Sequence, residues 1–298
     1  MAKNTLTDYI DLDQAYSEMP PPEDFVWPGF LAETVGSLVA PGATGKSFFA
    51  LQAAVSVAAA DQKGSDLVGL SPKKAGHVLY LAAEDPRDII RRRMYAIGAG
   101  TFLSPEARAA TVERLHITPI LGRRLNVLDE KILAEIIKIA RGYRLIVVDT
   151  LSRVHGLDEN DNGAMARLVA WLEYLAVETG AGVLFLHHTS KAAAFGGFLD
   201  TQQASRGASA LVDNTRWCGY VAKMTEAEAK ELVDPQRFSG PVGDRREQYV
   251  RFGVSKQNYG VLNTGKWFRR EEGGILVPAT IMEIMRDEKA KGGGREQA

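Results

Sequence analysis

One glycine-rich segment of the chain has the residue types needed to bind a polyphosphate. Residues 40–47 read APGATGKS and stand directly after one apolar run and directly before another. Such a loop turns backbone amides inward as an anion nest, and the helix that follows adds its positive N-terminal end. Lys46 can neutralise phosphate oxygens, and the Ser47 hydroxyl can bind Mg²⁺. The segment predicts a nucleotide site made by Gly42, Ala43, Thr44, Gly45, Lys46, Ser47 and Phe48.

Ala40 departs from the general pattern GxxxxGK(S/T), in which this position is the first glycine. Alanine does not reach positive φ cheaply, so the chain must enter the loop with ordinary dihedral angles here. A glycine-rich turn that only caps a helix is the alternative. The position between a strand and a helix favours a phosphate loop.

Two carboxylates follow apolar runs and suit magnesium binding and water activation. Asp149 ends the run LIVVDT, where a magnesium-associated aspartate follows a buried strand. Glu84 and Asp85 end the run LYLAAEDP, and Glu84 is the candidate base. Helix capping is the alternative for Asp149. A solvated acidic turn is the alternative for Glu84, and Asp85 is a candidate N-cap for a helix that Pro86 opens. Sites in open α/β sheets gather at these strand ends.

Two adjacent histidines, His187 and His188, end a further apolar run, VLFLHHTSK. Successive strand residues face opposite sides, so the pair is poorly placed to chelate one metal ion, and His187 is expected to be a hydrogen-bonded core residue. A histidine at this strand end can report the γ-phosphate to the segment that follows. The single cysteine, Cys218, excludes an intramolecular disulfide and a CxxC metal site and favours a reducing, cytoplasmic compartment.

The elements that must position these side chains are read from the apolar pattern. Apolar runs without polar alternation predict buried strands at 34–40, 76–83, 144–150 and 181–188. Helical stretches are expected at 47–60, 86–97, 129–141 and 164–179. This alternation predicts an α/β fold with a central, mostly parallel sheet. After residue 206, runs such as CGYVAKM and QYVRFGVSK favour antiparallel strands that extend the sheet edge.

Composition limits the partners and the domain organisation. The chain has 36 basic and 37 acidic residues, so no global field draws it onto a polyanion, and any nucleic-acid contact must be local. The most apolar window, 48–60, is shorter than the roughly 20 residues of a membrane helix, so no membrane partner is expected. We expect an extended acidic, proline-rich arm at 1–25, one core at 26–284 and a disordered tail at 285–298.

Six motifs, in this order, resemble those of the plasmid RepA-type hexameric replicative helicases of the RecA-like and DnaB-like superfamily. They are APGATGKS, YLAAEDP, VVDTLSR, FLHHTSK, QQASRGASALVDNTRW and RFGVSKQNYG. The resemblance covers most of the chain. It implies a RecA-like ATPase that assembles as a homo-oligomer, a ring of six, and binds ATP and Mg²⁺ between subunits. It also implies movement along single-stranded DNA in the central channel.

The resemblance assigns roles to single residues. Lys46, Ser47, Glu84, Asp149 and His188 match the phosphate lysine, the magnesium hydroxyl, the catalytic carboxylate, the second-motif aspartate and the γ-phosphate sensor. The same resemblance implies that Arg216 is an arginine finger that reaches the site of a neighbouring subunit. The residues alone indicate only a strand arginine paired with a surface acid. Lys256, in VSKQNYG, is a candidate to assist Arg216.

Two loops are candidates for DNA contact. The first, KAAAFGGFLDTQQ, lies between Lys191 and Arg206 and is long enough to be functional or disordered. The second follows Asp149 and carries Arg153 and His155, although its acidic stretch argues against tight DNA binding. The sequence shows no primase and no zinc ribbon, so we expect separate initiator and primase proteins.

Two other functions remain open on the sequence alone. A non-motor RecA-like ATPase of recombination or regulation would use the same fold as a nucleotide-dependent switch. A small-molecule phosphotransferase is disfavoured, because the chain shows no lid and no evident acceptor pocket. Strand displacement in the presence of ATP distinguishes the motor from the switch.

Overall fold

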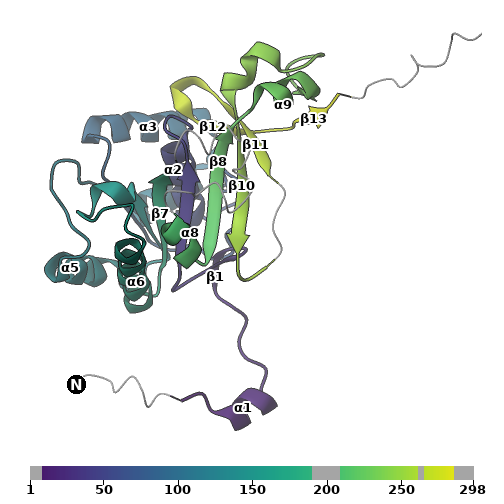
Figure 1. The fold of residues 1–298 in the computed structure, drawn as a ribbon. Coiled ribbons are helices and arrows are strands. Elements are labelled where there is room, and N and C mark those ends of the chain that lie inside the picture. The colour runs from purple at the N-terminus through teal and green to yellow at the C-terminus, as the bar shows by residue number, and fades with distance from the viewer. Residues whose placement is uncertain (1–8, 190–208, 261–264, 285–298) are drawn as a thin grey trace, which may run out of the picture.

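The computed structural model describes residues 9–189, 209–260 and 265–284, and a nine-stranded sheet forms the centre of this part of the chain (Figure 1). The strand order is β12-β11-β10-β8-β3-β7-β6-β4-β5. The bounds are β3 (Val35–Ala40), β4 (Val78–Ala82), β5 (Leu115–Pro119), β6 (Leu145–Asp149), β7 (Gly182–His188), β8 (Trp217–Lys223), β10 (Tyr249–Gln257), β11 (Lys266–Arg270) and β12 (Leu276–Ala279). Strands β8 to β5 pair in parallel, and β10, β11 and β12 extend the sheet antiparallel. The predicted α/β fold is confirmed.

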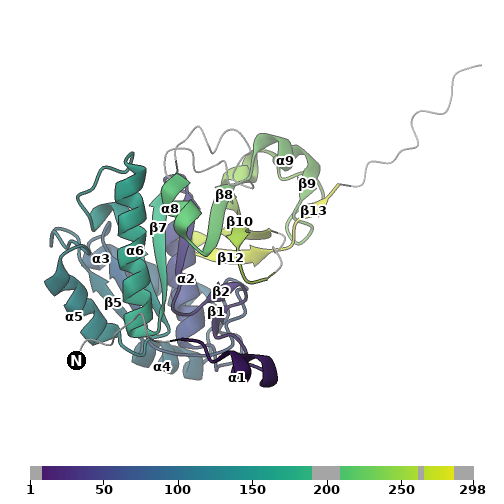
Figure 2. The same cartoon turned by 60° about the horizontal axis from the view of Figure 1, so that its bottom comes forward.

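Helices cover both faces of the sheet (Figures 1 and 2). One face packs against α2 (Lys46–Ala58) and α3 (Arg87–Gly100), and the other packs against α5 (Glu130–Ala140) and α6 (Asn162–Thr179). Alternate residues of β6 divide between the two cores, with Val147 on the α2 side and Val148 on the α6 side. Strands buried on both faces explain the unbroken apolar runs of the sequence.

The predicted helices are present, and their caps set their first residues. The Asp129 side chain accepts hydrogen bonds from the amides of Lys131 and Ile132, so α5 begins at Glu130 rather than at Asp129. Asp161 caps α6 in the same way, and this helix begins two residues ahead of the predicted start. The expectation that Asp85 caps α3 is wrong, because Pro86 is the N-cap residue and Asp85 pairs with Arg93.

The expectation that residues 218–224 form an antiparallel edge strand is half wrong. Strand β8 pairs in parallel with β3, from Gly36 opposite Trp217 to Val39 opposite Tyr220, and antiparallel with β10. It is therefore an inner strand of the sheet, and all its residues except Lys223 are buried. The antiparallel extension begins one strand later than predicted.

Helix α4 (Pro105–Arg114) and strand β5 are among the elements that were not predicted. Helix α4 begins after Ser104, whose hydroxyl accepts a hydrogen bond from the Ala107 amide. Strand β5 follows at once, and its sequence LHITP is a partly exposed edge strand with no continuous apolar run. Short or polar edge strands give little periodic signal.

The described part of the N-terminal arm is not wholly extended. It contains a short helix, α1 (Leu12–Ser17), capped by Asp11, and this helix has no buried residue (Figure 1). The arm reaches the core at Asp24, whose carboxylate accepts a hydrogen bond from Arg144 at 2.6 Å, directly before β1 (Phe25–Trp27) and β2 (Phe30–Leu31).

The remaining helices, strands and turns are not part of the nine-stranded sheet. They are α8 (Ser209–Asn214), α9 (Glu226–Glu231), β9 (Leu232–Val233), β13 (Met282–Glu283) and the 3-10 turns η2 (Leu151–Arg153), η5 (Gly243–Gln248) and η6 (Glu272–Gly274). Within the described ranges, no helix has both the length and the apolar character needed to cross a membrane. The predicted tail at 285–298 lies outside the described residues.

Candidate active site

The glycine-rich loop joins the C-terminal end of β3 to the N-terminus of α2. Ala40 is the last residue of β3 and lies opposite His188 of β7, so the expectation of ordinary dihedral angles at Ala40 is confirmed. The backbone instead adopts positive φ at Ala43 (59°) and at Gly45 (101°), the N-cap residue of α2. The loop thus ends at the positive end of a 13-residue helix.

Lys46 carries a buried cationic side chain. Its residue surface is only 4 % exposed, and its Nζ has no hydrogen-bond partner within the described part of the chain. Burial lowers the pKa of Lys46 to about 8, while the charges of Asp149 and Glu84 act in the opposite direction. An unpaired buried ammonium is costly, and an anion brought to this point would satisfy it. The loop therefore fits a polyphosphate.

Asp149 lies directly beside the loop. Its Oδ1 accepts a hydrogen bond from the Ser47 hydroxyl at 3.2 Å, and its Oδ2 accepts one from the Tyr80 hydroxyl at 2.6 Å. Burial raises the pKa of Asp149, although these two hydrogen bonds and the Lys46 charge lower it. A hydroxyl and a carboxylate at this separation are the oxygen ligands that Mg²⁺ prefers. The helix-capping alternative for Asp149 is wrong, since Thr150 is the N-cap residue of η2.

Glu84 and His188 come together from the ends of two different strands. Oε1 of Glu84 lies 3.0 Å from Nε2 of His188, and both side chains are partly exposed. His187 points the other way and is buried, which lowers its pKa to about 4, with the Lys46 charge as the next cause. A neutral, buried His187 agrees with its predicted place in the core.

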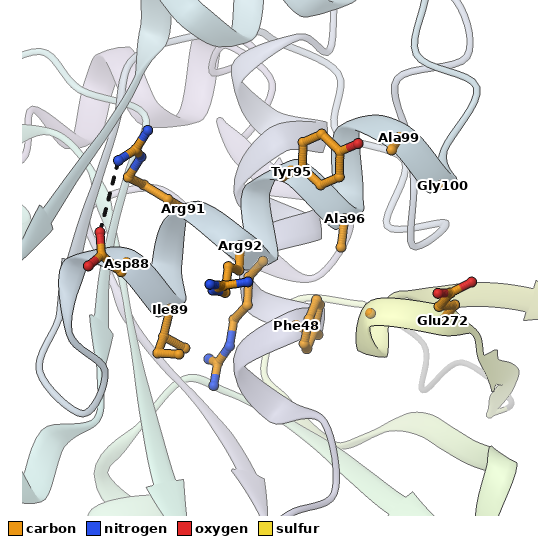
Figure 3. Close-up of a pocket in the computed structure, with 12 residues that line it drawn as sticks. Phe48, Asp88, Ile89, Arg91, Arg92, Tyr95, Ala96, Ala99, Gly100 and Glu272 are labelled. Carbon is orange, nitrogen blue, oxygen red and sulfur yellow. Dashed lines mark ion pairs between the residues drawn. The ribbon is translucent and has the colours of Figure 1, made fainter.

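Lys46, Glu84 and His188 line one cavity of about 280 Å³, together with Ser47. It is lined by Pro41, Ala43, Thr44, Gly45, Lys46, Ser47, Phe48, Glu84, Arg93, His188, Arg270 and Gly274. A larger cavity, of about 1080 Å³, lies beside it along α3 and also includes Phe48 and Arg93. Figure 3 shows Phe48 between α3, which carries Arg92 and Ala96, and the turn at Glu272.

Three residues of this region were not singled out in the sequence. Tyr80 is a tyrosine within an apolar strand. Because a buried tyrosine hydroxyl usually has a hydrogen-bond partner, its position could have indicated a polar residue on a neighbouring strand. Arg93 pairs with Asp85 at 2.7 Å and lies over the Phe48 ring. Arg270 donates a hydrogen bond to the Thr44 carbonyl at 2.8 Å. No local motif marked Arg270, because it is 226 residues away from Thr44 in the sequence.

Arg216 lies at the amino ends of the parallel strands, whereas the loop of its own chain follows their carboxyl ends. Its amide donates to the Val35 carbonyl at 3.0 Å, at the first residue of β3, whereas the loop follows the last residue of β3. The strand between them spans about 17 Å, farther than an arginine side chain extends. Lys256 lies at the same end of the sheet's strands as Arg216, and its Nζ donates to the Asp213 carbonyl at 2.6 Å.

Some of the candidate DNA-contact residues lie within the described ranges, and others do not. Arg153 is exposed at the end of η2. The side chain of His155 is only 2 % exposed, and its Nδ1 accepts the Leu157 amide at 3.2 Å, so an open DNA contact through His155 is not supported. Lys191 and Arg206 lie outside the described residues.

Comparison with known proteins identifies a family for this chain and solved structures with similar folds. A family model described as "AAA domain" matches residues 5–194. A solved structure described as an "ATPase Domain" is 14% identical, with a TM-score of 0.56, over 89% of this chain and 95% of that chain. Another, "The Structure Of A DnaB-Like Replicative Helicase And Its Interactions With Primase", is 14% identical, with a TM-score of 0.61, over 89% of this chain and 65% of that chain. At this identity the two structures establish a shared RecA-like fold.

Proposed function

The chain belongs to the AAA domain family and has the RecA-like ATPase fold, and from this premise we propose that it is an ATP-driven DNA helicase. It hydrolyses ATP at the interfaces of a ring, translocates on single-stranded DNA and separates duplex strands. The observation that carries the proposal is the buried ammonium of Lys46, which has no hydrogen-bond partner among the described residues, inside a cavity also lined by Ser47, Glu84 and His188.

The phosphate loop binds the nucleotide through contacts that the free protein lacks. Lys46 neutralises the β- and γ-phosphates, and loop amides from Gly42 to Ser47 donate to their oxygens. Ser47 and Asp149 would hold Mg²⁺, which would supply positive charge to the bound polyphosphate. The larger cavity beside Phe48 and Arg93 has room for the nucleoside.

Hydrolysis joins a water oxygen to the γ-phosphorus and breaks the bond from that phosphorus to the β–γ bridging oxygen. Glu84 orients the water and accepts its proton, because the carboxylate follows β4 at the rim of the phosphate cavity. His188 contacts Glu84 directly, so a change at the γ-phosphate is passed to β7 and to the segment after it. This contact gives His188 its role as sensor.

A neighbouring subunit completes the site. Arg216 is exposed and too far from its own loop to contribute there, which supports action in trans as an arginine finger. Such a finger stabilises the charge of the transition state and contributes roughly 10³ to 10⁵ in rate. Lys256 holds the backbone beside Arg216 and assists its placement.

DNA binding and assembly rest on the six motifs that resemble those of RepA-type helicases. Arg153 together with Lys191 and Arg206, repeated around a hexameric ring, supplies phosphate contacts without sequence preference. Residues 1–25 form the arm, 26–284 the motor core and 285–298 a tail. A role in replication of a plasmid, phage or integrated element implies a cytoplasmic location and separate initiator and primase proteins.

The test combines assembly with motor activity. The purified protein is sized with and without ATP and Mg²⁺, and unwinding of a forked duplex is compared for wild type and Lys46→Ala. We expect a ring-sized species, hydrolysis stimulated by single-stranded DNA, and unwinding that Lys46→Ala abolishes. Hydrolysis with DNA-dependent filament growth but no strand displacement would instead assign the chain to the non-motor, recombination or regulatory class.

A further inference from the structure

Arg270 links the antiparallel part of the sheet to the phosphate loop. It is the last residue of β11, and its Nη2 donates hydrogen bonds to the carbonyls of Thr44 at 2.8 Å and Ala43 at 3.4 Å. In a phosphate loop the backbone amides face the anion, so a donor that holds the carbonyls helps to keep the amides turned toward it. Arg270 therefore supports the anion-binding form of the loop.

The position of Arg270 is fixed by contacts that do not involve the loop. The Gln52 side chain of α2 pairs with the backbone of Leu276 in β12, with hydrogen bonds of 2.8 and 2.9 Å. Phe268, two residues before Arg270 on the same strand, is buried in the core beside Phe49. The strand end that carries Arg270 is thus held against α2.

Arg270 has no carboxylate in an ion pair with it among the described residues. The neighbouring Arg269, by contrast, forms ion pairs with Asp234 at 3.0 Å and Glu271 at 2.6 Å. A guanidinium has five N–H donors, and both loop contacts of Arg270 use the same nitrogen. Arg270 also lines the cavity that holds Lys46. A cation with further donors at the rim of this cavity is suited to phosphate.

We propose that Arg270 is a nucleotide-positioning residue that acts in cis: it holds the phosphate loop through the Thr44 carbonyl and donates its remaining N–H groups to the bound polyphosphate. The inference rests on the proposed nucleotide site and adds a second cation of the same subunit to Lys46. It differs from the role of Arg216, because the loss of a cis contact weakens nucleotide binding even in an isolated subunit.

The experiment measures the Kd of Mg-ADP and of inorganic pyrophosphate for wild type, Arg270→Ala, Arg270→Gln and Arg270→Lys. Arg270→Ala should raise both Kd values by about tenfold or more, because a hydrogen-bonded charge contact to phosphate is lost. Arg270→Gln keeps a hydrogen-bond donor for the loop but has no charge. It should therefore bind both probes as weakly as Arg270→Ala does. Arg270→Lys should recover part of the affinity, and KM for ATP should rise by a larger factor than kcat falls.

Arg141→Gln is the matched control, since Arg141 is an exposed arginine that forms an ion pair with Glu178. It precedes β6 and so lies at the amino ends of the parallel strands, opposite the loop. It should leave both Kd values unchanged. Folded Arg270→Gln with wild-type Kd values for Mg-ADP and pyrophosphate would overturn the inference alone. Failure of the wild type to bind either probe would overturn the proposed function and this inference together.

Discussion

At the scale of single residues, the site combines groups whose ordinary ionisation is changed by burial. Lys46, Asp149 and His187 are all nearly inaccessible, and the pKa of each is shifted in the direction that disfavours its charged form. Of these three in the described ranges, only Lys46 has a buried polar atom without a hydrogen-bond partner. A bound polyphosphate removes that deficit, so nucleotide affinity depends on the proton carried by Lys46.

This dependence predicts a pH effect on binding. In the free protein Lys46 loses its proton around pH 8, which is about its lowered pKa, while a bound polyphosphate raises that pKa. Above pH 8, binding must therefore take up a proton, and the affinity for ADP should fall by up to about tenfold per pH unit. Calorimetry between about pH 7 and pH 9.5 measures the Kd for ADP, and circular dichroism over the same range is the control for folding. A Kd that stays constant over this range contradicts a charged Lys46 contact.

Glu84 permits a second test at the same scale. Glu84→Gln keeps a similar shape but removes the group that accepts the proton of water, so kcat should fall by roughly 10² to 10⁴. The Kd for ADP should stay within about threefold, because nucleotide binding depends on the loop. Steady-state hydrolysis and calorimetry measure the two quantities.

Glu135→Gln, an exposed carboxylate of α5, is the matched control and should hydrolyse ATP at the wild-type rate. If Glu84→Gln also retains the wild-type kcat, another group activates the water.

The residues that could be predicted are those with local signals. Lys46 and Ser47 belong to a contiguous motif, and Glu84, Asp149 and His188 each end an apolar run, so strand topology brings them together. Tyr80 and Arg270 could not be found in this way, because each reaches the site by a contact that is distant in the sequence. Asp85 was misassigned because capping propensity competed with an ion pair to Arg93.

At the scale of elements, the loop between β3 and α2 determines the geometry of the site. Its conformation requires φ of 101° at Gly45, and a Cβ added there would lie 3.3 Å from Nη2 of Arg270. An L residue at this φ is strained, so the loop would shift and its amides would leave their anion-binding directions.

Gly45→Ala should therefore weaken ADP binding by about tenfold or more, which corresponds to the strain of an L residue at positive φ. Gly142→Ala is the matched control, since Gly142 also has positive φ, with open space around it and a position far from the loop. It should lower the melting temperature and leave the Kd for ADP unchanged. Equal Kd values for Gly45→Ala and wild type would show that the loop does not hold the nucleotide in this conformation.

The elements that the sequence predicted well are those with strong periodicity. The inner parallel strands and helices α2, α3, α5 and α6 appear as apolar runs and amphipathic stretches, so their types and order were accessible. The direction of β8 was not, because burial on both faces of a strand does not specify the direction of its neighbours. The edge strand β5 was missed because a partly exposed strand alternates too little to be recognised.

At the scale of the whole molecule, the sheet separates the two halves of the proposed site. The phosphate loop, Glu84 and His188 lie at the carboxyl ends of the parallel strands, whereas Arg216 and Lys256 lie near the amino ends of these strands. A chain built in this way cannot bring Arg216 to its own nucleotide. Under the proposed function, a neighbour whose Arg216 end is turned toward the first subunit's loop would complete the site, as a closed ring would for every subunit.

ATP hydrolysis by a mixture of two variants tests most directly whether the site is shared between subunits. Lys46→Ala cannot bind the phosphates in its own loop, and Arg216→Ala cannot complete the site of its neighbour, so each variant alone should be inactive. When the two are mixed and allowed to assemble, about a quarter of the interfaces join an intact loop to an intact arginine, and hydrolysis should return to about that fraction of wild type. A mixture that stays inactive although it assembles, or Arg216→Ala that hydrolyses ATP as fast as wild type, would contradict a site shared between subunits.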